Sequence, residues 1–188
     1  DDCINNATDY NCGGARYNTS YIQGVGLGSL TDILTSIKFN VFDNNRLSLP
    51  QLLDVLKADF EGFENTRNEF VNHTPKYGND DDYADSIMQR VFSSLYRAID
   101  GKPNTKDTSY HLNMLSTTCH IYFGKKLGAS ANGRMAAMPI SDGTSPSHGA
   151  DRKGPTAVIK SLGKMDQIKS GGTLLNQKFT PQVLETET

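Results

Sequence analysis

The side chains with the greatest capacity for chemistry lie in one stretch, residues 110–124, which includes Cys119 and His120. A cysteine beside a histidine suggests a nucleophile and its base. The β-branched and aromatic residues at the end of the stretch, however, predict a buried strand, and neighbouring residues of a strand point to opposite faces. We therefore expect Cys119 to be a buried structural thiol and assign no catalytic residue to this chain.

Three hydroxyl-bearing residues, Ser116, Thr117 and Thr118, come directly before that expected strand. In a loop that enters a barrel strand, such residues can line a pocket. In an ordinary core strand, the same hydroxyls bond to nearby backbone groups. The residues alone leave both interpretations open.

Three other motifs could hold an ion, and each also has a structural role to consider. The acidic run 80–82 lacks the alternating ligand spacing of a calcium loop, so we expect it to cap the helix that follows. His111 has no companion ligand at metal-binding spacing, and we predict no metal site. Arg134, in a glycine-flanked turn, could bind an anion or a backbone carbonyl, and the sequence does not separate these roles.

Composition excludes several classes of function. The chain has 188 residues and a net charge of −2 at pH 7. Its basic residues are scattered, so we expect neither nucleic acid nor a membrane surface as partner. No apolar run approaches the ~20 residues of a membrane span. The three cysteines have no C-x-x-C spacing, which fits a reducing cytosol and argues against disulfides and structural zinc.

Periodic apolar positions predict five helices, near residues 30–43, 48–60, 63–71, 83–100 and 155–162. Strands or extended segments are expected at 16–23 and 173–179, and loops at 124–154. Glycines at 24, 26 and 28 resemble a dinucleotide-binding turn, but the third comes one residue early. We favour close backbone packing at a helix start over phosphate binding.

Seven short blocks resemble the glycyl radical enzymes related to pyruvate formate-lyase. They occur in family order and at family spacing, at residues 13–18, 21–26, 74–80, 121–124, 132–134, 154–157 and 172–179. The resemblance implies an α/β fold, part of the ten-stranded α/β barrel of these enzymes, helix-rich with a few barrel strands. It places residues 1–188 in the C-terminal portion of that barrel domain, as an incomplete domain.

Within the family, residues 16–19, 78–85 and 117–124 are most similar to the branch that removes water from trans-4-hydroxy-L-proline to give 1-pyrroline-5-carboxylate. In that branch's pattern a proline stands where this chain has Ser116, a change that could alter what the pocket accepts. The alternatives are a choline trimethylamine-lyase, a diol dehydratase, an isethionate sulfite-lyase, a formate acetyltransferase, or a truncated non-catalytic paralogue.

The family's radical chemistry needs a Cys-x-Glu loop and a glycyl radical motif, Arg-Val-x-Gly-Tyr, and neither occurs in this sequence. The chain also begins without Met. We therefore expect a segment of a longer protein, lying after the cysteine loop and before the radical-bearing domain, and inactive alone.

For the longer protein, the resemblance implies a cytoplasmic, anaerobic homodimer that acts on a small molecule. Its glycyl radical would be installed by an S-adenosylmethionine iron-sulfur activase. The resemblance makes Ser116, Thr117 and Thr118 the expected substrate-binding wall, because their amides and hydroxyls suit a carboxylate.

Overall fold

The computed structural model describes residues 1–179. Its elements, in chain order, are α1 (Asp2–Asn5), a 3₁₀ turn (Tyr10–Cys12), β1 (Ser20–Gln23), α2 (Leu27–Ile37), a π-helical extension (Lys38–Asp43), α3 (Leu49–Lys57), α4 (Glu64–Asn72), α5 (Asp82–Ile99), β2 (Tyr110–Asn113), α6 (Cys119–Gly124), α7 (Pro155–Gly163) and a second 3₁₀ turn (Gln167–Lys169).

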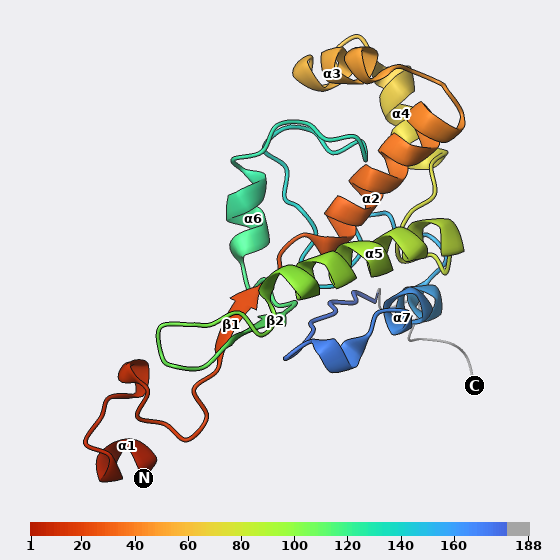
Figure 1. Ribbon diagram of the computed structural model, residues 1–188. Coiled ribbons are helices and arrows are strands. Elements are labelled where there is room, and N and C mark those ends of the chain that lie inside the picture. Colours follow the sequence, from red (N-terminus) through yellow and green to blue (C-terminus); the bar gives the residue numbers. More distant parts are fainter. Residues whose placement is uncertain (180–188) are drawn as a thin grey trace.

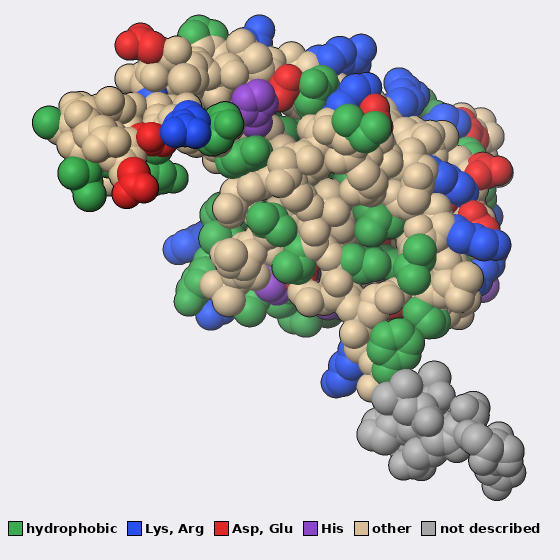
Figure 2. All heavy atoms as spheres, turned by 90° about the horizontal axis from the view of Figure 1, so that it is seen from below, with side chains coloured by type: hydrophobic (Ala, Val, Ile, Leu, Met, Phe, Trp, Pro, Cys, Tyr) green, Lys and Arg blue, Asp and Glu red, His purple; other side chains and the backbone are tan. Residues whose placement is uncertain are grey.

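Helices α2 and α5 cross at the centre of the molecule, and the other elements surround them (Figure 1). α3 and α4 lie beyond the C-terminal end of α2, and α7 lies beneath α5. The N-terminal segment with α1 projects away from the body in both Figure 1 and Figure 2. The body is therefore helical, and the strands occupy one end of it.

All five predicted helices are present, and local sequence explains their starts. Ser48 and Gln51 form a reciprocal capping box at α3, in which Gln51 Oε1 accepts from Ser48 N (2.8 Å). At α5 the Asp81 side chain accepts from the Tyr83 amide (3.0 Å). The prediction that the acidic run caps this helix is therefore confirmed.

Strands β1 and β2 pair in parallel, with Ser20 opposite Tyr110 and Gln23 opposite Asn113. β2 forms only the beginning of the stretch that we expected to end in a strand. Its last part, Cys119–Gly124, is helix α6 instead, so that prediction was wrong. A short apolar run does not by itself distinguish strand from helix. Here Cys119 N donates to the Ser116 carbonyl (2.9 Å), which turns the chain into the helix.

The strand expected at 173–179 is also absent from the described part of the chain. Thr173 makes only an isolated parallel bridge to Met114, and residues 174–179 form neither strand nor helix. The expectation that 124–154 is loop is confirmed, since no helix or strand occurs between α6 and α7.

Two clusters of buried apolar side chains form the core. One lies between α2, α5 and β2, and consists of Leu27, Tyr77, Met88, Phe92, Leu112, Met114 and Met165. The other joins the end of α2 to α3 and α4, and consists of Val41, Leu52, Val55, Phe60, Phe70 and Ala131. Apolar burial at both ends of α2 makes this helix the axis of the segment.

The buried face of α2 is nevertheless mostly polar. Thr31, Asp32 and Thr35 are fully buried, whereas Leu30 and Leu34, from the apolar stripe, are each 40% exposed. Small hydroxyl side chains allow close approach, and the loop 141–147 packs directly on this face. Ser29 and Ser141 exchange hydrogen bonds there, from Ser29 N to Ser141 Oγ (2.9 Å) and from Ser141 N to Ser29 Oγ (2.7 Å).

Gly26 and Gly28 show why small residues are needed where this helix begins. A Cβ at Gly28 would lie 2.4 Å from the Ser145 carbonyl oxygen, and Gly26 has a φ of +83° with Ile140 against it. These contacts are the close backbone packing that we expected from residues 24–28.

Candidate functional site

The hydroxyl-bearing loop that follows β2 is anchored at its first residue. Ser116 is fully buried, and its Oγ accepts a hydrogen bond from the Gly143 amide (3.1 Å). Segments 114–116, 143–144 and 172–174 lie side by side, because Met114 N donates to Gly172 O (2.8 Å) and Thr144 N to Leu174 O (2.9 Å). The bond from Gly143 to Ser116 therefore fixes where the loop leaves the core.

Thr117 and Thr118 face outward from this anchor. Both are exposed, and Thr117 has a positive φ of +46°, an uncommon conformation for a β-branched residue. Within residues 1–179 neither of their amides donates a hydrogen bond, while Thr117 Oγ1 donates to the Ser116 carbonyl (2.8 Å). The loop thus presents two adjacent amide donors in a locally strained turn.

Cys119 is half-buried on α6 rather than buried in a strand, and its Sγ lies 3.9 Å from Thr117 Oγ1. All three cysteines of the chain are free thiols. His120 lies near Ser116, with Nδ1 3.5 Å from Ser116 Oγ, and its ring centroid is 6.4 Å from that of His148. The loop is therefore flanked by a thiol and two imidazoles.

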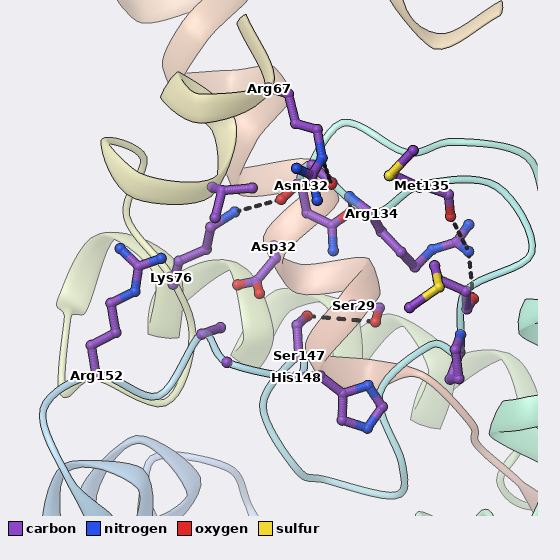
Figure 3. Close-up of a pocket in the computed structure, with 16 residues that line it drawn as sticks. Ser29, Asp32, Arg67, Lys76, Asn132, Arg134, Met135, Ser147, His148 and Arg152 are labelled. Carbon is purple, nitrogen blue, oxygen red and sulfur yellow. Dashed lines mark hydrogen bonds between the residues drawn. The ribbon is translucent and has the colours of Figure 1, made fainter. Parts of the chain in front are cut away.

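A separate cavity of about 240 Å³ lies on the other side of His148, between α2, α4 and the loops 132–139 and 147–152. Figure 3 shows Asp32 near its centre, with Lys76 and Arg152 to one side and Arg134 to the other. None of Ser116, Thr117 and Thr118 lines it. The sequence analysis did not single out Asp32 or Lys76. A carboxylate among the small hydroxyl residues on one face of a helix could have indicated a buried acid.

The buried acid and base of this cavity are electrostatically linked. Asp32 Oδ1 accepts from the Tyr77 amide (2.9 Å), while its Oδ2 is buried without a partner among the described residues. Burial raises the pKa of Asp32 to about 6, and the positive charge of Lys76 opposes that rise. Burial lowers the pKa of Lys76, whose Nζ donates to the Asn132 carbonyl (3.2 Å).

The structure resolves the role of Arg134, which the sequence left open. Its guanidinium donates to the carbonyls of Gly128 (2.5 Å), Met135 (3.2 Å) and Met138 (2.7 Å), and its Nε donates to Ser130 Oγ (3.1 Å). Burial lowers the pKa of this guanidinium. Arg134 therefore organises the loop around its own backbone.

His111 contacts a carboxylate at the end of α5. Its Nδ1 lies 2.8 Å from Asp100 Oδ1. A hydrogen bond from Tyr96 lowers the pKa of Asp100 most, and the hydrogen bond from His111 lowers it further. Among residues 1–179 no three His, Cys, Asp or Glu side chains gather as metal ligands would. No helix in that range combines the length and apolar character needed to cross a bilayer.

Two protein families match the sequence. The pyruvate formate lyase-like family matches residues 1–124, and the glycine radical family matches residues 140–188. Because the first match covers most of the chain, the chain belongs to the pyruvate formate lyase-like family. The match to the glycine radical family begins at residue 140. It therefore overlaps the segment that we expected to lie wholly before the radical-bearing domain.

Among individual relatives, the chain is 58% identical over 187 residues to trans-4-hydroxy-L-proline dehydratase of Clostridioides difficile, a match that covers 100% of this chain and 24% of the relative. It is 39% identical over 177 residues to isethionate sulfite-lyase of Bilophila wadsworthia, which covers 89% of this chain and 20% of the relative. The chain thus spans about a quarter of the length of the first of these relatives.

Solved structures agree with these relationships. The crystal structure of the C. difficile hydroxyproline dehydratase with trans-4-hydroxy-L-proline bound superposes with a TM-score of 0.94, over 100% of this chain and 24% of that one. The glycerol-bound, B12-independent glycerol dehydratase of Clostridium butyricum gives 0.91 at 36% identity, with the same coverage. The chain therefore folds as part of the α/β barrel of glycyl radical enzymes, as the sequence blocks predicted.

Proposed function

We propose that this chain is part of a glycyl radical lyase that removes water from trans-4-hydroxy-L-proline to give 1-pyrroline-5-carboxylate. The observation that carries the proposal is the 58% identity to a hydroxyproline dehydratase across the whole chain. Identities to the isethionate and glycerol enzymes are much lower, at 39% and 36%. The chemistry of a hydroxyl on a small ring amino acid is therefore favoured over carbon–sulfur cleavage.

In this proposal the chain supplies part of the substrate-binding wall. The amides of Thr117 and Thr118 and the Thr118 hydroxyl donate to no acceptor among the described residues, and a carboxylate is the group of hydroxyproline that such donors suit. Ser116 is not exposed, so its part is to hold the loop through Gly143. The loop would orient the substrate before any bond is broken.

The glycyl radical and the Cys-x-Glu loop of the longer protein would together supply hydrogen-atom abstraction next to the hydroxyl-bearing carbon. The residues of this chain bind and enclose the substrate, and the barrel core behind Ser116 excludes water. Since the sequence has neither Cys-x-Glu nor Arg-Val-x-Gly-Tyr, no proton or hydrogen transfer is assigned to it.

The same proposal includes the setting of the reaction. Residues 1–188 are proposed to be the C-terminal portion of the barrel domain, as an incomplete domain, and residues 140–188 also match the glycine radical family. The longer protein is a cytoplasmic homodimer that works without oxygen. Its partner is an activase that uses S-adenosylmethionine and an iron–sulfur cluster to form the radical.

An anaerobic assay of the full-length protein with its activase tests the reaction. After electron paramagnetic resonance has demonstrated the radical, we expect loss of hydroxyproline and formation of 1-pyrroline-5-carboxylate. Isethionate, glycerol, 1,2-propanediol and choline should be inert. Turnover of one of these instead would assign the chain to another branch, and a protein that forms no radical would favour the non-catalytic paralogue.

The role of the loop is tested by Thr118→Val, which keeps the shape of the side chain and removes its hydroxyl. Because the variant loses one hydrogen bond to the charged carboxylate of the substrate, KM for hydroxyproline should rise roughly tenfold or more. The control is Thr156→Val, at an exposed position on α7, which should leave KM unchanged. A substrate complex in which residues 117–118 lie beyond one bridging water would refute the role.

A further inference from the structure

The cavity that contains Asp32 and Lys76 takes no part in the proposed reaction, and its polar groups are incompletely satisfied. Asp32 is 0% exposed, and its Oδ2 accepts no hydrogen bond within residues 1–179, although the nearby Ser147 hydroxyl lowers the pKa of Asp32. A buried acceptor without a donor is costly, so such atoms mark places where a ligand or an ordered water binds. Asp32 projects from α2 into this cavity (Figure 3).

Lys76 faces the same cavity but does not satisfy Asp32. Its Nζ donates to Asn132 O and lies within 4.0 Å of no carboxylate in the described part of the chain. An ammonium group has three donors, so further acceptors fit there. The buried base and the buried acid are thus more than 4.0 Å apart, and both line the cavity.

The rim of the cavity is cationic. Arg67 uses Nε to bind the Gly133 carbonyl (3.0 Å), and Arg152 uses Nη2 to bind Asn72 Oδ1 (2.6 Å). Their other N–H groups donate to no acceptor among residues 1–179, and neither guanidinium pairs with a carboxylate there. The positive charges of Arg67, Arg152 and Lys76 together exceed the single negative charge of Asp32. The cavity therefore favours the binding of an anion.

A ligand that satisfies both features must accept hydrogen bonds from the cations and donate one to Asp32. We propose that this cavity binds a small oxyanion that carries one protonated oxygen, as monohydrogen phosphate does. Its O–H group donates to Asp32 Oδ2 while accepting from Lys76, and its remaining oxygens face Arg67 and Arg152. A sulfate ion has the same shape but no hydrogen to donate, so Asp32 repels it.

Several charged groups face Asp32 from the elements packed against α2 and bear on its protonation. They are Lys76 from the segment after α4, Asp85 from α5, and Arg67, Arg134, His148 and Arg152 around the cavity. Because the pKa of Asp32 lies at about 6, acid conditions protonate it and supply the donor that sulfate lacks. Discrimination between the two anions should therefore depend on pH.

Isothermal titration calorimetry of the full-length protein with inorganic phosphate and with sulfate tests the proposal. At about pH 8 we expect phosphate to bind at least about tenfold more tightly than sulfate, because an unmatched buried acceptor costs at least that factor. At about pH 5 the preference should disappear. Equal binding at pH 8, or no binding of phosphate, overturns the proposal, since either result means that Asp32 selects no protonated oxyanion.

Two variants separate Asp32 from its neighbours. Asp32→Asn keeps an oxygen for the Tyr77 amide and adds an N–H donor, so sulfate should bind as tightly as phosphate at both pH values. If the variant retains pH-dependent selectivity, another group causes it and the proposal fails. Arg152→Gln, at an exposed position, should raise the dissociation constants of both anions several-fold without changing the ratio between the two constants. Arg97→Gln, at an exposed position near the C-terminal end of α5 and outside the cavity, is the matched control and should change the affinity of neither anion.

Discussion

Ser116 connects two segments that are distant in the sequence, because its hydroxyl is the acceptor for the buried Gly143 amide. Removing the hydroxyl leaves that N–H group without a partner in a dry environment. The expected consequence reaches Thr117 and Thr118, whose exposed amides depend on where the loop leaves the core.

Ser116→Ala should lower the free energy of unfolding by about 1–3 kcal/mol, the cost of one unsatisfied buried donor. Chemical denaturation of the full-length protein measures this change, and KM for the substrate should rise in parallel. Ser86→Ala, at an exposed position on α5, provides the comparison and should stay within about 0.5 kcal/mol of wild type. Equal effects of the two substitutions would mean that the Gly143 bond does not hold the loop.

Asp32 makes stability depend on pH. Its pKa is raised from the ordinary 3.8 to about 6, so the fold favours the protonated acid. The stabilising contribution is complete below pH 3.8 and is lost as the pH rises through about 6. Across this window the loss amounts to about 3 kcal/mol, at about 1.4 kcal/mol per pH unit.

Asp32→Asn, which resembles the protonated acid at every pH, should remove this dependence. Measured by denaturation at about pH 4 and about pH 7.5, the variant should gain about 2–4 kcal/mol relative to wild type at the higher pH. A difference between variant and wild type that is constant across the two pH values would show that Asp32 does not titrate in this range.

At the scale of elements, α2 is positioned by backbone contact as much as by apolar packing. Gly28 allows the helix to touch the loop at Ser145, and the Ser29–Ser141 hydrogen bonds hold that approach. The same helix carries Asp32 into the neighbouring cavity.

Gly28→Ala should therefore destabilise the protein by about 1–3 kcal/mol or more, because the new methyl group meets a carbonyl oxygen that cannot rotate away. Gly163→Ala at the end of α7 has nothing within 4 Å of the added Cβ, and should be neutral or stabilising by up to about 1 kcal/mol. Thermal unfolding of both variants provides the comparison, and similar melting temperatures would contradict the packing argument.

The helices could be predicted from sequence because caps and apolar periodicity are local signals, as at Ser48 and Asp81. The strands could not be placed in the same way. Cys119–Gly124 has strand-like residues but turns into a helix at Ser116, and Thr173 pairs only because Met114 lies beside it. The buried face of α2 was also hidden, since close packing of Thr31 and Thr35 is a tertiary contact that no period reveals.

The candidate site could be predicted only in part, because it too depends on tertiary contacts. The sequence singled out the loop 116–118 because hydroxyl residues cluster there. It gave no sign that Ser116 turns inward while Thr117 and Thr118 turn outward. The cavity of Asp32 and Lys76 joins residues from α2, the segment after α4 and the loop near 147, and spacing along the chain does not bring these together.

At the scale of the molecule, the apolar stripe of α2 lies at the surface of this segment. Leu30 and Leu34 are 40% exposed and border a groove against Ile87, Val91 and Leu95 of α5. Hydrophobic side chains also appear at several places on the face shown in Figure 2. Because this chain aligns with about a quarter of its longer relatives, we expect further parts of the barrel to cover the groove.

Cysteine labelling measures how far the groove is shielded from solvent in the full-length protein. In Leu34→Cys the thiol should react with a maleimide quickly in residues 1–188 alone and at least about tenfold more slowly in the full-length protein. Ser86→Cys, at an exposed position elsewhere on α5, corrects for intrinsic reactivity and should label at similar rates in both. Equal protection ratios at the two positions would show that the groove stays open.

The parallel pairing of β1 with β2 has a consequence for the order of folding. Ser20 and Tyr110 become neighbours only after α2 to α5 have been made between them, and closing so long a loop is slow compared with forming a helix. The helical centre should therefore assemble first, and the strands should join late. The loop 116–118 follows β2 directly, so it should be among the last parts of the segment to reach its folded position during synthesis.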